Sequence, residues 1–210
     1  MKHEIYIFGS MTRGEVSSSS DADVLVIKDN AVSGSFPPSW SVYSKGTIDT
    51  YFADGRLFAW HLHLDAVQVY PRTGSGFLAD LGEPAPYTSA VEDIADLQLL
   101  LENSMRELQI DSPSLIYELG LAYTAIRDIA MAASWSMLAK PSFSRYTPYE
   151  LPVRCPLPLA VYETAMRARH ASTRGTAEPS DYDLAAKYLK ATPILEWAES
   201  IRRKTCRTHF

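Results

Sequence analysis

One stretch near the start of the chain, IFGSMTRGEVSSSSDADVLVI at residues 7–27, constrains the fold more than any other part of the sequence. An apolar, β-branched run ends abruptly at Gly9-Ser10, and ten mostly small or polar residues follow. A second apolar run then begins at Asp21-x-Asp23. A plain surface loop accounts for the serines but not for two acids one residue apart at the mouth of a strand. Because side chains two positions apart on a strand share a face, both carboxylates are expected on one side of a sheet.

The residues after the first strand favour phosphate binding. A short helix is expected to start at Gly9-Ser10, with Ser10 or Thr12 as its cap. The first turn of a helix presents unpaired N–H groups that bind anions. Gly9 lets the backbone approach closely, Ser10 adds a hydroxyl donor, and Arg13 adds a cation one turn later. These three residues are the candidate nucleotide-binding residues.

The acids that follow favour a metal ion. Asp21 and Asp23 offer hard carboxylate oxygens, which suit Mg²⁺, an ion that takes its other ligands from water and from substrate phosphates. The segment GTIDTYFA is interpreted as a third strand, on which Asp49 would complete a cluster of three carboxylates. Asp54 and Asp65 compete with Asp49 for that role. A phosphate cradle beside metal carboxylates is the equipment of phosphoryl or nucleotidyl transfer.

The pattern of apolar residues predicts an α+β chain with two domains. Residues 1–86 alternate short strands, at 4–8, 23–28, 46–53 and 66–70, with loops and a helical stretch at 54–64. From about residue 88 the apolar residues recur at helical spacing. Helices are predicted at 88–108, 112–140, 158–171 and 181–204, the last of them interrupted at Pro193. A helical bundle that binds substrate or a partner is therefore expected over residues 87–210.

The Gly-Ser and Asp-x-Asp stretch near the start of the chain resembles the signature of the DNA polymerase β-like nucleotidyltransferase superfamily. The resemblance rests on Gly9-Ser10, the ten-residue spacer, Asp21-Ala22-Asp23 and a later acid at Asp49, with Arg13-Gly14 matching the Gly-Ser-x-x-Arg-Gly form of small bacterial members. It covers about residues 3–54 in detail. The helical second half is similar in a looser way to kanamycin-type nucleotidyltransferases and to minimal nucleotidyltransferases paired with HEPN-type toxins. The fold implied is a mixed sheet flanked by helices, followed by a helical bundle.

The resemblance also implies a mechanism. Asp21 and Asp23 would bind two Mg²⁺ ions that carry a nucleoside triphosphate, Ser10 would hold its terminal phosphates, and Asp49 would ligate the catalytic metal or accept the acceptor's proton. The hydroxyl of an acceptor would attack the α-phosphate and release pyrophosphate. ATP is the expected donor. Residues alone indicate only a site for Mg²⁺ and phosphate; the reaction comes from the family.

A second candidate for the general base lies in the helical half. Glu118 and Arg127 are charged residues within the nearly apolar stretch 112–140. Lone charges in a buried helix are costly unless they are paired or functional. Glu118 is therefore interpreted as the partner of Arg127 in an internal ion pair. The resemblance to kanamycin-type enzymes, which place a catalytic base on their helical domain, implies the alternative that Glu118 is such a base.

Composition limits the remaining classes. The net charge of −5 argues against a dedicated nucleic-acid-binding protein. Cys155 and Cys206 are too few and too far apart for a zinc knuckle or a disulfide scaffold, so they are interpreted as free thiols of a reducing compartment. The N-terminus does not resemble a signal peptide, and no apolar run has the length of a membrane span. A cytoplasmic protein is expected.

Two other functions stay open from the sequence. The chain is also compatible with an antitoxin-like protein that neutralises a HEPN-type toxin by binding or by adenylylation, and with an aminoglycoside nucleotidyltransferase. The acceptor would then be a protein hydroxyl or a drug hydroxyl. The apolar helical half leaves both a protein partner and a homodimer open.

Overall fold

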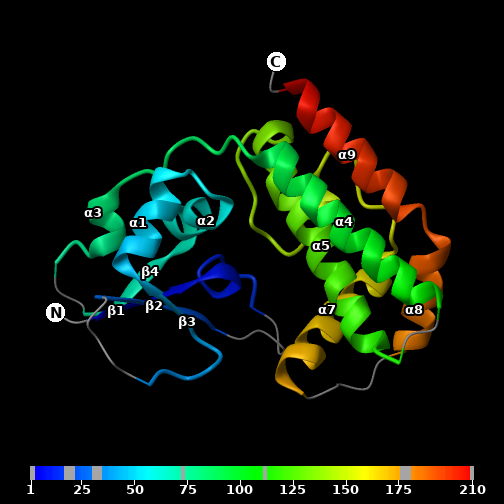
Figure 1. Ribbon diagram of the computed structural model, residues 1–210, viewed down its shortest axis with the longest axis horizontal. Coiled ribbons are helices and arrows are strands. Elements are labelled where there is room, and N and C mark those ends of the chain that lie inside the picture. The colour runs from blue at the N-terminus through cyan, green and yellow to red at the C-terminus, as the bar shows by residue number, and fades with distance from the viewer. Residues whose placement is uncertain are drawn as a thin grey trace. The chain divides into compact units, whose positions relative to one another are not determined.

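The computed structural model describes residues 3–16, 22–29, 35–71, 74–110, 113–175 and 181–208. The chain forms two compact units, Met1–Ser89 and Ala90–Phe210. The first unit contains a β-sheet with short helices, and the second is helical (Figure 1). The predicted α+β class is confirmed.

The described strands of the first unit form a mixed, four-stranded sheet in the order β3-β2-β1-β4. β1 (His3–Phe8) runs antiparallel to β2 (Asp23–Lys28) on one side and to β4 (Val67–Tyr70) on the other. β3 (Ser41–Ser44) pairs in parallel with β2 at the edge. The strands predicted at 4–8, 23–28 and 66–70 are confirmed.

Helices α1 (Lys45–Ala53), α2 (Leu57–Asp65) and α3 (Phe77–Leu81) cover one face of this sheet (Figure 1). Alternate residues of the two central strands point to that face and meet the apolar side of the helices. The resulting core consists of Tyr6, Phe8, Leu25, Ile27, Ile48, Phe52, Ala59, Leu62 and Leu78. Each large apolar side chain buried in this way stabilises the unit by about 1.5–3 kcal/mol. The core fixes β1, β2 and α2 relative to one another.

The strand predicted at 46–53 is wrong, because these residues form α1. Ile48 and Phe52 are both buried, and their spacing of four places them on one side of a helix as readily as on one side of a strand. The helix is decided at its start, where the Ser44 hydroxyl accepts a hydrogen bond from the Thr47 amide at 3.0 Å. The strand of this region is instead β3, which ends where the helix begins.

The turn between α1 and α2 contacts residues 85–86, near the end of the first unit. The Trp60 indole N–H donates to the Ala85 carbonyl at 2.9 Å, and the Ala85 amide donates to the Phe52 carbonyl at 2.9 Å. Gly55 lies in this turn with φ of +63°, and a Cβ there would collide with the carbonyls of Ala85 and Pro86. Only glycine permits both the backbone conformation and this close approach.

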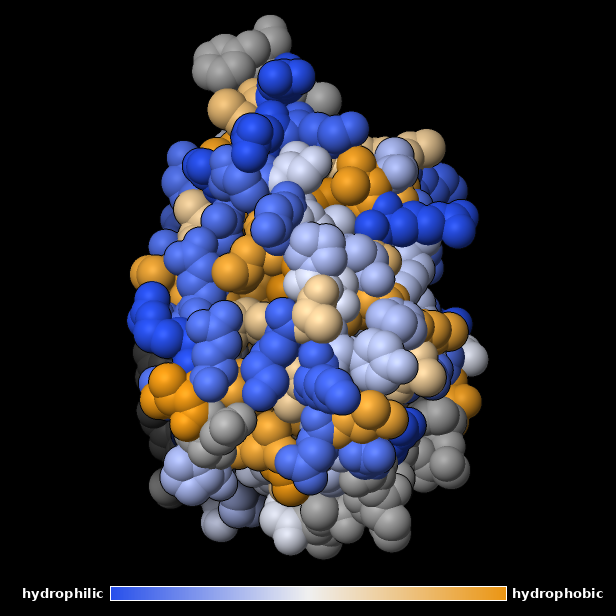
Figure 2. Space-filling model, turned by 90° about the vertical axis from the view of Figure 1, so that its right-hand side faces the viewer, coloured by the Kyte–Doolittle hydropathy of each residue, from blue (hydrophilic) through white to orange (hydrophobic). Residues whose placement is uncertain are grey.

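The second unit is built around one buried helix, α5 (Leu115–Met137), whose residues 129–134 are all buried. α4 (Ala90–Gln109), α7 (Leu159–Arg174) and α9 (Ile194–Thr208) pack against α5, with α8 (Tyr182–Ala191) beside α7 and short α6 (Thr147–Glu150) beside α5. The predicted interruption at Pro193 separates α8 from α9. Figure 2 shows that one face of this unit is largely hydrophilic, with separate hydrophobic patches between hydrophilic residues.

No helix in the described part of the chain is long and apolar enough to cross a membrane.

Gly55→Ala is expected to lower the free energy of unfolding by more than the ~1–2 kcal/mol that a left-handed alanine costs, because the new methyl group also displaces residues 85–86. Gly14→Ala is the control in the same unit, since Gly14 also has a positive φ, +74°, and no atom within 4 Å of an added Cβ. Urea unfolding of both variants measures the difference. Equal losses would show that the contact with residues 85–86 is unimportant.

Candidate functional site

The pairing of β1 with β2 brings the two halves of the sequence motif together. Phe8, the last residue of β1, lies opposite Asp23, the first residue of β2. Gly9 follows directly, is buried, and has φ of +79°. A Cβ on Gly9 would collide with the Asp23 carboxylate, so this carboxylate lies against the glycine backbone. The Gly-Ser turn and the second acid of Asp-x-Asp are therefore neighbours in space.

The turn after β1 is tighter than predicted. Gly9–Met11 form a single 3₁₀ turn, η1, and no side chain caps it, so the prediction of a cap by Ser10 or Thr12 is wrong. The Thr12 hydroxyl instead donates to the Gly9 carbonyl at 2.9 Å, and the Glu15 amide donates to the Ser10 carbonyl at 2.8 Å. One 3₁₀ turn lacks the aligned dipole of a long helix. The donors it offers are local: backbone N–H groups and the Ser10 hydroxyl.

Ser10 is placed to serve as such a donor. Ser10 is half-buried and is the middle residue of the turn Gly9–Met11. Among the described residues, its hydroxyl has no hydrogen-bond partner. A hydroxyl that is not engaged within the protein is available to a ligand oxygen.

Arg13, the third candidate nucleotide-binding residue, is held by acids of its own domain. Its Nη1 forms an ion pair with Oδ2 of Asp65 and lies 3.3 Å from Nε2 of His61. Its Nη2 lies 3.4 Å from Oε2 of Glu15. The Arg13 side chain is only 21% exposed. The guanidinium therefore links the Gly-Ser turn to the end of α2.

Asp65 is the acid at the centre of this arrangement. It is the last residue of α2, its side chain is 9% exposed, and its Oδ2 lies 3.0 Å from Nε2 of His61. Burial alone would raise the pKa of Asp65, but the hydrogen bonds and charges of His61 and Arg13 outweigh burial and lower it. The carboxylate form of Asp65 is thus stabilised by the fold.

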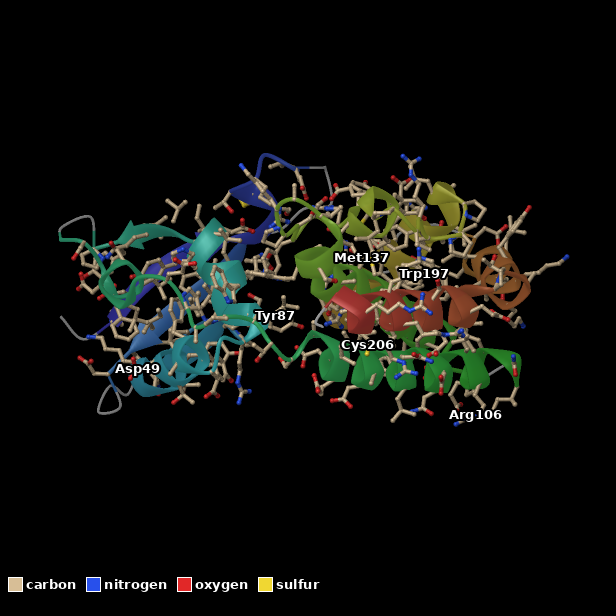
Figure 3. All side chains as sticks on the ribbon, turned by 90° about the horizontal axis from the view of Figure 1, so that it is seen from above. Asp49, Tyr87, Arg106, Met137, Trp197 and Cys206 are labelled. Carbon is tan, nitrogen blue, oxygen red and sulfur yellow. The ribbon has the colours of Figure 1, made fainter. Side chains whose placement is uncertain are left out.

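The structure places the predicted metal ligands unequally. Asp23 is exposed at the start of β2, beside Gly9, whereas Asp21 lies outside the described residues. Asp49 is exposed on α1 and projects from the first unit in Figure 3. The residues of β3, Ser-Val-Tyr-Ser, include no acid. The reasoning that placed Asp49 beside Asp23 on a neighbouring strand no longer holds, and a metal role for Asp49 stays a prediction.

The described ranges contain no group of three His, Cys, Asp or Glu side chains arranged to hold a metal ion. Asp23 nevertheless fits Mg²⁺ by its donor chemistry, because it supplies hard oxygens at an exposed strand end. Its contact with Gly9 sets those oxygens next to the turn that carries Ser10.

The ion pair predicted between Glu118 and Arg127 is wrong. Arg127 pairs with its neighbour Asp128, with 2.7 Å between Nε and Oδ1, and lies over the Tyr123 ring at 5.6 Å. Glu118 is 8% exposed, and burial raises its pKa, with the charge of Glu107 adding to the effect. A role for Glu118 as general base stays a prediction.

A groove of about 590 Å³ opens in the second unit, between the starts of α5 and α8. Its lining includes Tyr117, Tyr182, Asp181 and Asp183. Asp181 is already engaged, because its carboxylate caps α8 by accepting from the Leu184 amide at 2.9 Å. None of the residues proposed from the sequence lines this groove.

The sequence pattern did not identify His61 and Asp65 as a contacting pair beside the Gly-Ser turn. The sequence predicted only a helical stretch at 54–64, which includes His61, and Asp65 was a candidate only as a competitor of Asp49 for the third metal acid. His61 and Asp65 are four residues apart and share one side of α2, where His61 also packs edge-on against the Phe8 ring at 5.3 Å. Their helical spacing could have been noticed; the arginine 48 and 52 residues earlier could not.

The comparison with known families agrees with this geometry. Residues 2–66 match the family described as the nucleotidyltransferase domain. This part of the chain is a nucleotidyltransferase domain, in agreement with the predicted membership of the polymerase β-like superfamily. The match spans β1 to the end of α2, and so includes Gly9, Ser10, Asp23 and Asp65. No curated protein matches the chain.

Gly9→Ala is expected to displace the Asp23 carboxylate at little cost beyond the ~1–2 kcal/mol of a left-handed alanine, because this carboxylate is the end of an exposed, flexible side chain. Gly14→Ala is the control in the same turn, since Gly14 has φ of +74° and open space around an added Cβ. Urea unfolding compares the two variants, whose losses should be similar. A much larger loss in Gly9→Ala would show that the Asp23 carboxylate cannot move aside.

The stability that Asp65 contributes should depend on pH in acid. Its pKa is lower in the folded protein than the ordinary 3.8, so the contribution is complete above that value and is lost as the pH falls through the folded pKa. The difference in free energy of unfolding between wild type and Asp65→Asn should therefore be constant near neutrality and shrink below pH 3.8. Denaturant titrations at a series of pH values measure it. A difference that persists unchanged in acid would contradict the ion pair.

Proposed function

We propose that the protein is a Mg²⁺-dependent nucleotidyltransferase that transfers AMP from ATP to the hydroxyl group of an acceptor. The observation that supports this most directly is the contact between Gly9 and the Asp23 carboxylate, within a domain that matches the nucleotidyltransferase family. This chemistry needs groups that donate hydrogen bonds to phosphate beside a carboxylate that binds the metal ion.

Each residue of the motif has a separate task in this proposal. Asp23, with Asp21, supplies the carboxylate oxygens for Mg²⁺. The Ser10 hydroxyl and the N–H groups of the turn after Gly9 donate to the phosphates of the nucleotide. Bound Mg²⁺ would supply positive charge that neutralises the triphosphate as the reaction proceeds. The exposed position of Asp23 lets the nucleotide approach from solvent.

At the α-phosphorus, the reaction forms one bond and breaks one bond. The acceptor oxygen bonds to the α-phosphorus, the bond from that phosphorus to the bridging oxygen breaks, and pyrophosphate leaves with the electron pair. The hydroxyl proton passes to a base, for which Asp49 and Glu118 are the candidates from sequence. The acceptor is a small molecule or a protein side chain, and the helical unit is proposed to bind it.

Thermal unfolding with ATP, GTP, CTP and UTP, each with and without Mg²⁺, tests the donor and the metal together. A ligand that binds only the folded state stabilises it by ~2.7 kcal/mol at a hundredfold excess over its dissociation constant. We expect a Mg²⁺-dependent rise in melting temperature with ATP that is lost in Asp23→Asn. No shift with any triphosphate, or a full shift in Asp23→Asn, would overturn the proposed function.

The same assay resolves the position of Asp49. Because Asp49 is exposed on α1, we expect Asp49→Asn to keep the Mg²⁺-dependent shift. Loss of the shift, in a variant that melts like the wild type without nucleotide, would instead assign Asp49 to the metal site.

A further inference from the structure

The turn that carries Ser10 is closed by its own backbone. The Arg13 amide donates to the Gly9 carbonyl at 3.3 Å, and the Gly14 amide donates to the Met11 carbonyl at 3.3 Å. These bonds shape the turn but do not attach it to the rest of the domain. The Arg13 side chain does so, because its partners Asp65 and His61 lie on α2, packed on the sheet core.

The charges around Arg13 do not favour an anion. Asp65 and Glu15 contribute two carboxylates against one guanidinium, so the group has no positive excess when His61 is neutral. Nη1 faces Asp65 and His61, and Nη2 faces Glu15. Nε is buried and has no hydrogen-bond partner among the described residues. The guanidinium therefore has little surface left to offer a phosphate.

The position of Asp65 makes the arginine necessary. A carboxylate at the last residue of a helix lies at the negative end of the helix dipole, and burial adds a desolvation cost. Arg13 and His61 offset both effects by direct contact. Removing Arg13 would leave a nearly buried carboxylate without its guanidinium partner. The arginine and the aspartate should act as one unit.

We infer that Arg13 is a positioning residue, and that Asp65 and His61 act through it. The three side chains fasten the Gly9–Glu15 turn to α2 and so hold the Ser10 hydroxyl and the turn amides ready for the phosphates. If the turn is already ordered before the nucleotide binds, the binding free energy does not have to offset the entropy lost on ordering it. The affinity for the nucleotide is therefore higher. This inference rests on the proposed function and changes one role in it: Arg13 holds the turn and does not itself hold the phosphates.

A double-mutant cycle tests the inference. The dissociation constant of MgATP is measured calorimetrically for wild type, Arg13→Gln, Asp65→Asn and the double variant, below the melting temperature of each. Each single change breaks the contact between Arg13 and Asp65 and should weaken binding about tenfold. The double variant should lie within about twofold of the single variants, because either single change already breaks this shared contact.

Two results would overturn the positioning role. If Arg13 bound phosphate directly, Asp65→Asn would release its guanidinium and tighten MgATP binding. If the two residues acted separately, their effects on the dissociation constant would multiply, giving about a hundredfold loss in the double variant.

Matched controls exclude a general effect of altered charge. Asp29→Asn breaks a surface ion pair with Lys45, at 3.1 Å, just beyond the end of β2 opposite to Asp23. His63→Gln changes an exposed histidine two residues from His61 on the same helix. Both should bind MgATP as the wild type does, whereas His61→Gln should weaken binding. A loss of the same size in the controls would also overturn the inference.

The failure of the inference is distinct from the failure of the proposed function. If wild type binds none of the triphosphates, the function is wrong, and the positioning role falls with it. The attachment itself is then still measured by urea unfolding of the same four proteins, where additive losses would show that Arg13 and Asp65 do not act as a unit.

Discussion

The antiparallel pairing of β1 with β2 is the interaction on which the candidate site depends. An antiparallel pair brings the end of one strand beside the start of the next. Phe8 therefore lies opposite Asp23, and the glycine that follows Phe8 meets the carboxylate. The apolar residues of both strands secure this register, since a slip of one residue would turn Leu25 and Ile27 away from the helices. The chemistry of the site is thus held by the core beneath it.

The same core also positions the helix that contacts the Gly-Ser turn. α2 packs on the sheet through Ala59 and Leu62, and the end of this helix presents His61 and Asp65 to Arg13. A cation in a phosphate-binding motif is readily interpreted as a phosphate ligand. Here its neighbours are acids, and the charge of the arginine is used within the protein. In the proposed function, positive charge at the triphosphate would then come from Mg²⁺.

The match between sequence and structure differs from element to element. The strands at 4–8 and 23–28 were predictable because their apolar residues are bounded by clear turn signals. The stretch at 46–53 was not, because two apolar residues four apart satisfy both periodicities and the cap at Ser44 decided for a helix. Arg127 was paired with a distant glutamate in the prediction, but adjacent Asp128 is its partner. Short segments and charge partners depend on neighbours that periodicity does not reveal.

The sequence by itself determined the strands before and after the Gly-Ser turn, the place of Asp23 at the start of the second of them, the α+β class and the nucleotidyltransferase resemblance, because the spacing of apolar and motif residues can be read along the chain. Only the tertiary structure decided that Arg13 contacts Asp65 and His61. The physical reason is distance along the chain. A contact between residues about fifty positions apart is created by the packing of α2 on the sheet, and no local pattern encodes it.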